Sequence, residues 1–150
     1  MTYTHRPLIL TDRIVLKDLL LDLGYPQTEE SLTTIMQTYT NEREYYAYVA
    51  MSEGIVCGVI AWHMRRLFVN ARLKVSIEGL VVNPRMHRRG VGQYLMGIVE
   101  VFARNEGVWV IDLTSGRYRA SSGAHAFYQS LGYDNTGMGE KIYLRKIIKQ

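Results

Sequence analysis

The chain has 150 residues, a formal net charge of +4 and a hydrophobic fraction of 47%. This combination is typical of one folded domain with its own core and excludes a disordered chain. No apolar run is long enough to span a bilayer, and no apolar signal core follows the polar residues 1–6, so we expect a cytoplasmic protein without membrane contact. The modest charge disfavours nucleic-acid binding, because a DNA footprint needs a wide basic face.

Two helices are predicted first along the chain. Asp12 is an N-cap candidate for a helix that runs to Leu23, and Gly24 supplies its C-terminal stop. Thr28 caps a second helix that runs to about Tyr39, with acidic residues in its first turn. His5, which precedes the first helix, is assigned to a mobile terminus.

A hairpin, a further strand and a long helix follow. Residues 45–51 and 55–64 are rich in aromatic and β-branched side chains, and the Glu53-Gly54 turn between them favours a hairpin. Residues 73–82 form the next predicted strand. Apolar side chains spaced three and four apart predict a helix over residues 90–105.

The last third predicts a strand over residues 108–113, a short helix capped by Ser121 or Ser122, and a final strand pair at 133–136 and 141–148. The fold class is therefore α/β (α+β): a mixed, mostly antiparallel central sheet of about six to seven strands with helices on both faces. No repeat or linker divides residues 1–150, so we expect one domain. The strand at 141–148 has two interpretations. In the plainer one it is a final strand with one solvated face, and in the second it forms a homodimer.

Residues 77–96 carry the first functional signal. A buried strand stops at Pro84, a basic loop with Arg88 and Arg89 follows, and Gly90 and Gly92 open the long helix. A helix N-terminus offers free N–H groups and a partial positive charge, and glycine lets a ligand approach the backbone closely. This stretch predicts a site that binds a pyrophosphate.

Three classes of phosphate site compete for this stretch, and a second motif decides between them. No P-loop string exists, and Leu95 stands where a dinucleotide fingerprint needs its third glycine. Residues 124–133 read A-H-A-F-Y-Q-S-L-G-Y. Together, the two motifs resemble the GNAT superfamily of N-acetyltransferases, over most of the chain from Asp12 onwards. The Leu-Gly-Tyr-Pro stretch at residues 23–26 resembles many small bacterial members.

The resemblance implies acetyl-coenzyme A as co-substrate, bound mostly through backbone N–H groups of the loop. His87 occupies the family's usual Gln or Arg position, and Ser121 stands where many members have a cofactor-contacting Asn. The strand backbone pairs with the pantetheine arm much as a strand pairs with a peptide. The residues assigned to acetyl-coenzyme A are Leu80, Val81, Val82, His87, Arg88, Arg89, Gly90, Val91, Gly92, Ser121 and Tyr128.

The resemblance also implies direct transfer of the acetyl group to a primary amine, which needs a proton acceptor and a proton donor. Tyr128 aligns with the family's general acid; packing on the short helix is its alternative role. Glu78 is the base candidate, because a carboxylate in an apolar strand is costly to bury without a purpose. Strand alternation puts it on one face with Leu80 and Val82. The alternatives are a structural hydrogen bond for Glu78 and a proton relay through water.

The cysteines and histidines of the chain indicate whether it can bind a metal ion. Cys57 is the single cysteine and is expected to be a small buried side chain, so a disulfide and a multi-cysteine site are excluded. His63 is interpreted as packing on a strand, and His125 as either touching the cofactor or exposed. The histidines show no H-x-x-x-H spacing, so no metal is expected.

The acceptor is expected to be a small molecule with a primary amine. Acidic residues on or after the second helix would attract a cationic amine such as an aminoglycoside or a polyamine. One alternative is acetylation of a protein N-terminus or lysine, and another is a coenzyme A-binding sensor without transferase activity. The acidic residues in question are Glu29, Glu30, Glu42 and Glu44.

Overall fold

The computed structural model describes residues 2–115 and 123–148. They fall into two units, residues 1–114 and residues 115–150. The organisation of the whole chain as one domain stays a prediction.

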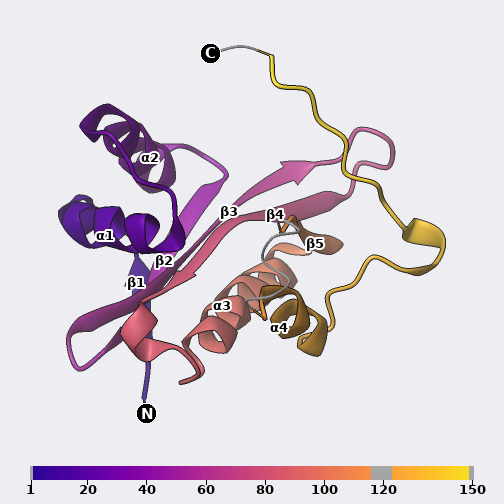
Figure 1. Cartoon of the computed structure of the whole chain (residues 1–150). Helices are drawn as coiled ribbons and strands as arrows, with labels where there is room; N and C mark the ends of the chain where they lie inside the picture. Colours follow the sequence, from indigo (N-terminus) through magenta and orange to yellow (C-terminus); the bar gives the residue numbers. More distant parts are fainter. Residues whose placement is uncertain (1, 116–122, 149–150) are drawn as a thin grey trace. The chain divides into compact units, whose positions relative to one another are not determined.

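The first unit is built on a five-stranded sheet in the order β1-β2-β3-β4-β5 (Figure 1). The first three pairings are antiparallel and the β4–β5 pairing is parallel. The predicted mixed, mostly antiparallel sheet is confirmed, with fewer strands than expected. The strands are β1 (Thr4–Pro7), β2 (Tyr45–Ser52), β3 (Ile55–Arg66), β4 (Leu73–Val82) and β5 (Val110–Leu113).

Helices cover both faces of this sheet, as predicted. Helices α1 (Arg13–Leu23) and α2 (Glu29–Asn41) lie on one side and α3 (Val91–Glu106) on the other (Figure 1). Burial of apolar surface on each face supplies the main stabilisation. The first core contains Leu16, Leu19, Leu32, Met36, Val49, Val59 and Val81. The α3 side contributes the buried residues Val91, Leu95, Met96, Val99 and Ala103.

The helix boundaries follow the sequence signals closely, although one cap works differently. Gly24 ends α1 in a left-handed conformation with φ of 102°. The Thr28 side chain accepts a hydrogen bond from the N–H of Ser31 at 3.0 Å, as an N-cap does. Asp12 instead accepts two hydrogen bonds from Arg6, at 2.8 and 2.9 Å. It therefore ties the N-terminal strand to the start of α1.

Strand β1 was not predicted. Thr4–Pro7 pairs antiparallel with β2, and Nδ1 of His5 lies 2.7 Å from the Tyr94 hydroxyl on α3. The assignment of His5 to a mobile terminus is therefore wrong. The segment is short and largely exposed, so it lacks the apolar alternation that identifies a strand.

A β-bulge interrupts β4 at Glu78. Ala61 of β3 pairs with Gly79 and Trp62 pairs with Ile77, which leaves Glu78 without a partner residue. A bulge adds one residue to one strand and reverses the alternation of side chains beyond it. The prediction that Glu78 shares a face with Leu80 and Val82 is therefore wrong.

The second unit contains α4 (Ala124–Ser130) and a short 3-10 helix, η4 (Gly137–Gly139). Ser121 and Ser122, the predicted caps, lie outside the described residues. The predicted final strand pair is absent from residues 123–148. The Asn135 side chain bonds both the N–H and the carbonyl of Lys141, at 2.7 and 2.6 Å. A side chain that satisfies the backbone in this way competes with strand pairing.

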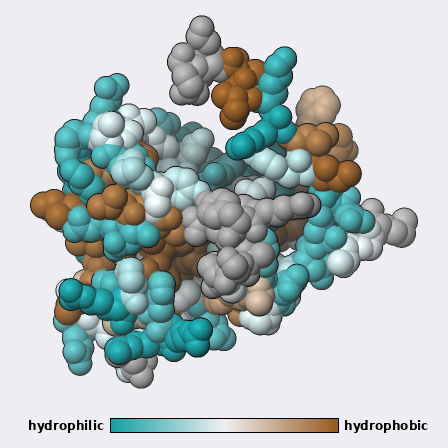
Figure 2. Space-filling model, viewed as in Figure 1, coloured by the Kyte–Doolittle hydropathy of each residue, from teal (hydrophilic) through white to brown (hydrophobic). Residues whose placement is uncertain are grey.

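The segment at 141–148 keeps an irregular path. Its large apolar side chains are exposed, and Figure 2 shows apolar surface on this segment. A second apolar area lies over α1 in the same view. Exposed apolar residues of this helix include Ile14 and Leu21. Within the described part of the chain, no helix is long and apolar enough to cross a membrane. The exposed residues of the segment are Ile142, Tyr143, Leu144, Ile147 and Ile148.

Candidate active site

Half of β4 has a free edge. Strand β5 pairs with Lys74–Ile77 only, so no strand of the described residues covers the same edge of β4 beyond Ile77. Leu80, Val81 and Val82 lie on this free portion and are bonded to β3 on their other side. An extended ligand arm can add to such an edge through main-chain hydrogen bonds.

The free edge leads to the N-terminus of α3. The connection runs through η2 (Pro84–Met86), Arg88 with φ of 62° and Gly90 with φ of 81°. Gly90 is the N-cap and has no side chain to cap the helix, so the first N–H groups of α3 stay available. His87, Arg88 and Arg89 are exposed around them. Free N–H groups and exposed cations suit a pyrophosphate.

Gly58 of β3 holds this helix start against the sheet. A Cβ built at residue 58 would lie 2.8 Å from the Val81 carbonyl oxygen and 3.0 Å from Cδ1 of Leu95. Ordinary contacts between carbon atoms are about 3.5–4.0 Å. Only glycine allows α3 to approach β3 this closely, so Gly58 helps to set the position of the loop before α3.

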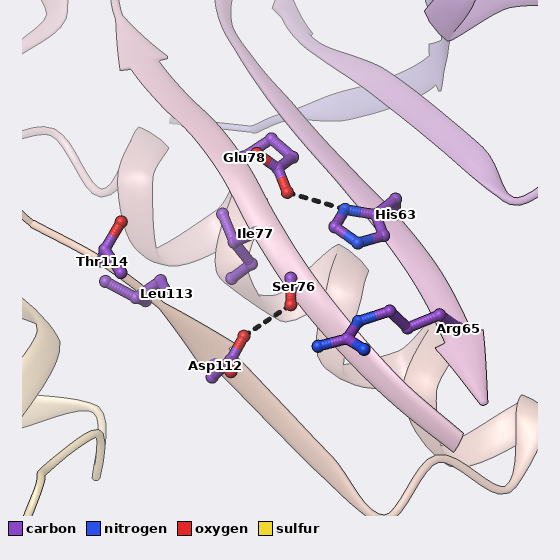
Figure 3. A pocket seen from close by; sticks show the side chains of 8 residues that line it. All are labelled: His63, Arg65, Ser76, Ile77, Glu78, Asp112, Leu113 and Thr114. Carbon is purple, nitrogen blue, oxygen red and sulfur yellow. Dashed lines mark hydrogen bonds and ion pairs between the residues drawn. The ribbon is translucent and has the colours of Figure 1, made fainter. Parts of the chain in front are cut away.

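A hollow of about 250 Å³ opens where β3, β4 and β5 meet. Figure 3 shows its lining side chains, which come from all three strands. Pockets for drug-sized ligands usually measure about 300–1,000 Å³, so this one suits a small molecule or the end of a larger one. Its lining residues are His63, Arg65, Ser76, Ile77, Glu78, Asp112, Leu113 and Thr114.

His63 and Glu78 form a pair in this pocket. Nδ1 of His63 lies 2.7 Å from Oε2 of Glu78, and their side chains are 24% and 42% exposed. A carboxylate only accepts hydrogen bonds, so we assign the Nδ1 proton to this contact, which leaves the lone pair of a neutral ring on Nε2. Such a pair can take a proton from a substrate. The sequence left open whether Glu78 is a buried base or a hydrogen-bonded side chain; the structure shows a partly exposed carboxylate that contacts His63, and its role as a base stays a prediction.

Two tyrosines continue from this pair towards α2. The ring of Tyr45 lies 5.7 Å from that of His63, and Tyr39 lies 5.4 Å from Tyr45, measured between ring centroids. Burial, and after it the negative charge of Glu78, raises the pKa of Tyr39 to about 12. Tyr39 therefore stays protonated at physiological pH and offers a neutral aromatic wall near the His63–Glu78 pair.

The opposite end of the pocket holds Asp112 of β5. Its Oδ1 accepts a hydrogen bond from Ser76 at 2.6 Å, and its Oδ2 pairs with Lys74 at 2.5 Å. Both carboxylate oxygens are thus engaged by β4. Arg65 reaches over the same pocket from β3 (Figure 3).

The comparisons with known proteins agree with this geometry. A model of the acetyltransferase (GNAT) family matches residues 14–133. The chain belongs to the GNAT family. The resemblance predicted from residues 77–96 and 124–133 is thereby confirmed.

Individual relatives of this GNAT chain are distant. N-acetyltransferase family 8 member 2 of Rattus norvegicus is 28% identical over 109 residues, which are 73% of this chain and 47% of that protein. The chain thus spans about half the length of this curated relative.

Solved structures share the fold. A transcriptional regulator from Bacillus halodurans C-125 has a TM-score of 0.82 at 19% identity, covering 95% of this chain and 100% of its own. The aminoglycoside N-acetyltransferase AAC(6')-Iy in complex with CoA has a TM-score of 0.80 at 21% identity, covering 97% of this chain and 95% of its own. At these identities the likeness establishes the fold alone.

The second GNAT motif lies in the second unit. Tyr128 is half-buried on α4, with its ring 5.2 Å from Phe127 and 6.4 Å from Tyr133. The N–H of Tyr133 donates to the carbonyl of Tyr128 at 3.0 Å, which folds the chain back after the helix. The role of Tyr128 as general acid stays a prediction, as does the contact of Ser121 with the cofactor.

Glu29, one of the four acidic residues expected to attract a cationic amine, already has partners of its own. Glu29 pairs with Arg13 at 2.8 Å and with Lys17 at 2.7 Å. Hydrogen bonds from Lys17 and then Arg13 lower the pKa of Glu29 to about 2. Its charge is already balanced, so Glu29 is poorly suited to attract a cationic amine. Among residues 2–115 and 123–148, no three His, Cys, Asp or Glu side chains gather as metal ligands would.

Proposed function

We propose that this chain is an acetyl-CoA-dependent N-acetyltransferase that acts on a primary amine of a small molecule. The observation that carries the proposal is the free edge of β4. It runs from the His63–Glu78 pair at one end to the open N-terminus of α3 at the other. A co-substrate with a thioester at one end and a pyrophosphate further along needs a proton-transfer pair and then an anion site, in this order along the edge.

The loop and the free edge would hold the co-substrate. The N–H groups of Gly90, Val91 and Gly92 and the cations of Arg88 and Arg89 match the charge of a pyrophosphate. The backbone of Leu80–Val82 would pair with the pantetheine arm, and one of its N–H groups would polarise the thioester oxygen. His87 lies at the edge of this loop and contributes a polar side chain.

The pocket pair would perform the proton transfer. Nε2 of His63 accepts a proton from the amine, and Glu78 stabilises the imidazolium that forms. The amine nitrogen attacks the thioester carbon, so that a C–N bond forms and the C–S bond breaks. The leaving thiolate takes a proton from Tyr128. The products are an N-acetylated amine and free coenzyme A thiol.

The acceptor class rests on two lines of support. The pocket is small and lined by both polar and apolar residues, and AAC(6')-Iy, which shares the fold, has been solved with the bisubstrate analogue CoA-S-monomethyl-acetylneamine. A cytoplasmic location and a homodimer formed through residues 141–148 stay predictions from the sequence.

An amine panel tests the proposal. The protein is incubated with acetyl-CoA and aminoglycosides, polyamines, amino acids, their carboxamides or short peptides, and free thiol is measured. We expect thiol release with at least one small amine. The Glu78→Gln and Tyr128→Phe variants should each lower kcat about 10²–10⁴-fold, the usual contribution of a general acid or base.

Two results would point elsewhere. Turnover of peptides alone would identify a protein acetyltransferase. Tight coenzyme A binding without turnover of any amine would identify a sensor, and in that case Tyr128→Phe would leave the dissociation constant for coenzyme A unchanged.

A further inference from the structure

Arg65 is the one pocket charge without a counter-charge among the described residues. Glu78 is paired with His63, and Asp112 is engaged by Ser76 and Lys74. Arg65 makes no hydrogen bond or ion pair with any described residue. The residues outside the description, 1, 116–122 and 149–150, contain no Asp or Glu side chain.

Arg65 is exposed to solvent and has a like charge as its neighbour across the strand pair. Arg65 lies directly opposite Lys74 in the β3–β4 register, and like charges across a strand pair repel. Lys74 forms an ion pair with Asp112, whose two carboxylate oxygens are then both bonded, one to Lys74 and one to Ser76. Arg65 extends across the pocket instead (Figure 3). A guanidinium there matches an anion supplied from outside.

We propose that the acceptor amine also bears a carboxylate, as a small amino acid does, and that Arg65 binds this carboxylate. The inference rests on the proposed acetyltransferase function and names its substrate class. A planar guanidinium forms two parallel hydrogen bonds with a carboxylate. One uncompensated cation balances a monoanion, which favours a carboxylate over a doubly charged phosphate.

The spacing of the pocket groups supports one small molecule that reaches both ends. His63 and Arg65 are two residues apart on one face of β3, which separates their Cα atoms by about 7 Å. The amine lies at Nε2 of His63 while the carboxylate lies at the guanidinium. The acetyl group then moves from the thioester sulfur to this nitrogen. The nitrogen loses a proton to His63, and coenzyme A is released as the free thiol.

Paired substrates test the role of Arg65. Each standard α-amino acid and β-alanine is compared with its own carboxamide, which keeps the amine and removes the negative charge. We expect kcat/KM of the best amino acid to exceed that of its carboxamide at least about tenfold, the usual size of a charge-assisted hydrogen bond. Arg65→Gln should lower this ratio about tenfold, mainly through KM, and Arg65→Lys should recover part of it.

Arg66→Gln is the matched control. It removes the same charge one residue along β3, where the side chain points to the other face and Arg66 bonds the carbonyl of Ala71 at 2.5 Å. The ratio should be unchanged in this variant. Preference for carboxamides in the wild type, or equal ratios in the Arg65 and Arg66 variants, would overturn the inference while leaving the acetyltransferase function intact.

A binding measurement decides the question if no amine is turned over. The same amino acids are titrated calorimetrically into protein loaded with coenzyme A. Binding by the wild type that weakens about tenfold in Arg65→Gln, but not in Arg66→Gln, supports a carboxylate site. Equal affinity in all three proteins, or no binding to any, refutes it.

Discussion

Replacing Gly58 by alanine tests the packing that holds the phosphate loop. The new methyl group would lie 2.8 Å from the Val81 carbonyl oxygen, 3.0 Å from Cδ1 of Leu95 and 3.2 Å from Cγ1 of Val91. Side chains can turn aside, but the carbonyl oxygen belongs to the β4 backbone. The sheet or α3 must therefore shift.

The magnitude follows from the cost of overpacking. Extra methyl groups forced into a packed core cost about 1–3 kcal/mol. In a chain of this size, that corresponds to a fall in Tm of about 3–10 °C. Because α3 carries the loop at its start, the dissociation constant for coenzyme A should rise as well.

Thermal and urea denaturation followed by circular dichroism measure the stability effect. Gly97→Ala is the matched control, since a Cβ at this position on α3 meets nothing within 4 Å. It should stabilise the protein by up to about 1 kcal/mol, because alanine favours helix over glycine. If Gly58→Ala were as stable as the wild type, the argument from close approach would be refuted.

Three further predictions concern individual side chains. The single substitutions His63→Gln and Glu78→Gln should each lower kcat/KM about 10²–10⁴-fold, as measured by thiol release. The double variant should lose little more activity than either single variant, because the two side chains act as a unit; additive losses would contradict the pairing. Asp12→Asn should lower the free energy of unfolding by about 2–3 kcal/mol at neutral pH, because it removes a carboxylate that is bonded to Arg6. The hydrogen bond from Arg6 lowers the pKa of Asp12 in the folded protein. The stabilisation is therefore present at pH values above the unfolded-state pKa of about 4, and it is lost as the pH falls through the lower folded-state pKa. If the stability difference between wild type and Asp12→Asn grew in acid, this reasoning would be refuted. Burial raises the pKa of the Cys57 thiol, so it should react with Ellman's reagent only upon unfolding, and rapid labelling of the native protein would contradict its placement in the core.

The sequence predicted the elements whose signals are local. Gly24 and Thr28 set helix boundaries through their own backbone and side-chain preferences, and the Glu53-Gly54 turn has positive φ at both residues. The loop before α3 was found because its chemistry is carried by consecutive residues.

Features that depend on partners distant in sequence could not be predicted. His63 meets Glu78 only because β3 and β4 are in one particular register, and the bulge at Glu78 is a single extra residue. Gly79 after Glu78 was the only local hint, since glycine inside a strand often marks a bulge. Residues 141–148 alternate like a strand, but alternation alone supplies no neighbouring strand to pair with.

The bulge at Glu78 divides β4 into two parts that can change independently. Before it, Ser76 lines the pocket and Lys74 pairs with Asp112, whereas after it Val81 packs into the core beneath α1 and α2. Substitutions in the first part alter which molecule fits beside the base, but leave the free edge and the core of the second part untouched. An engineer who wishes to change the acceptor can therefore vary Ser76, which lines the pocket, keep the buried Val75 and Ile77, and expect the protein to keep its fold.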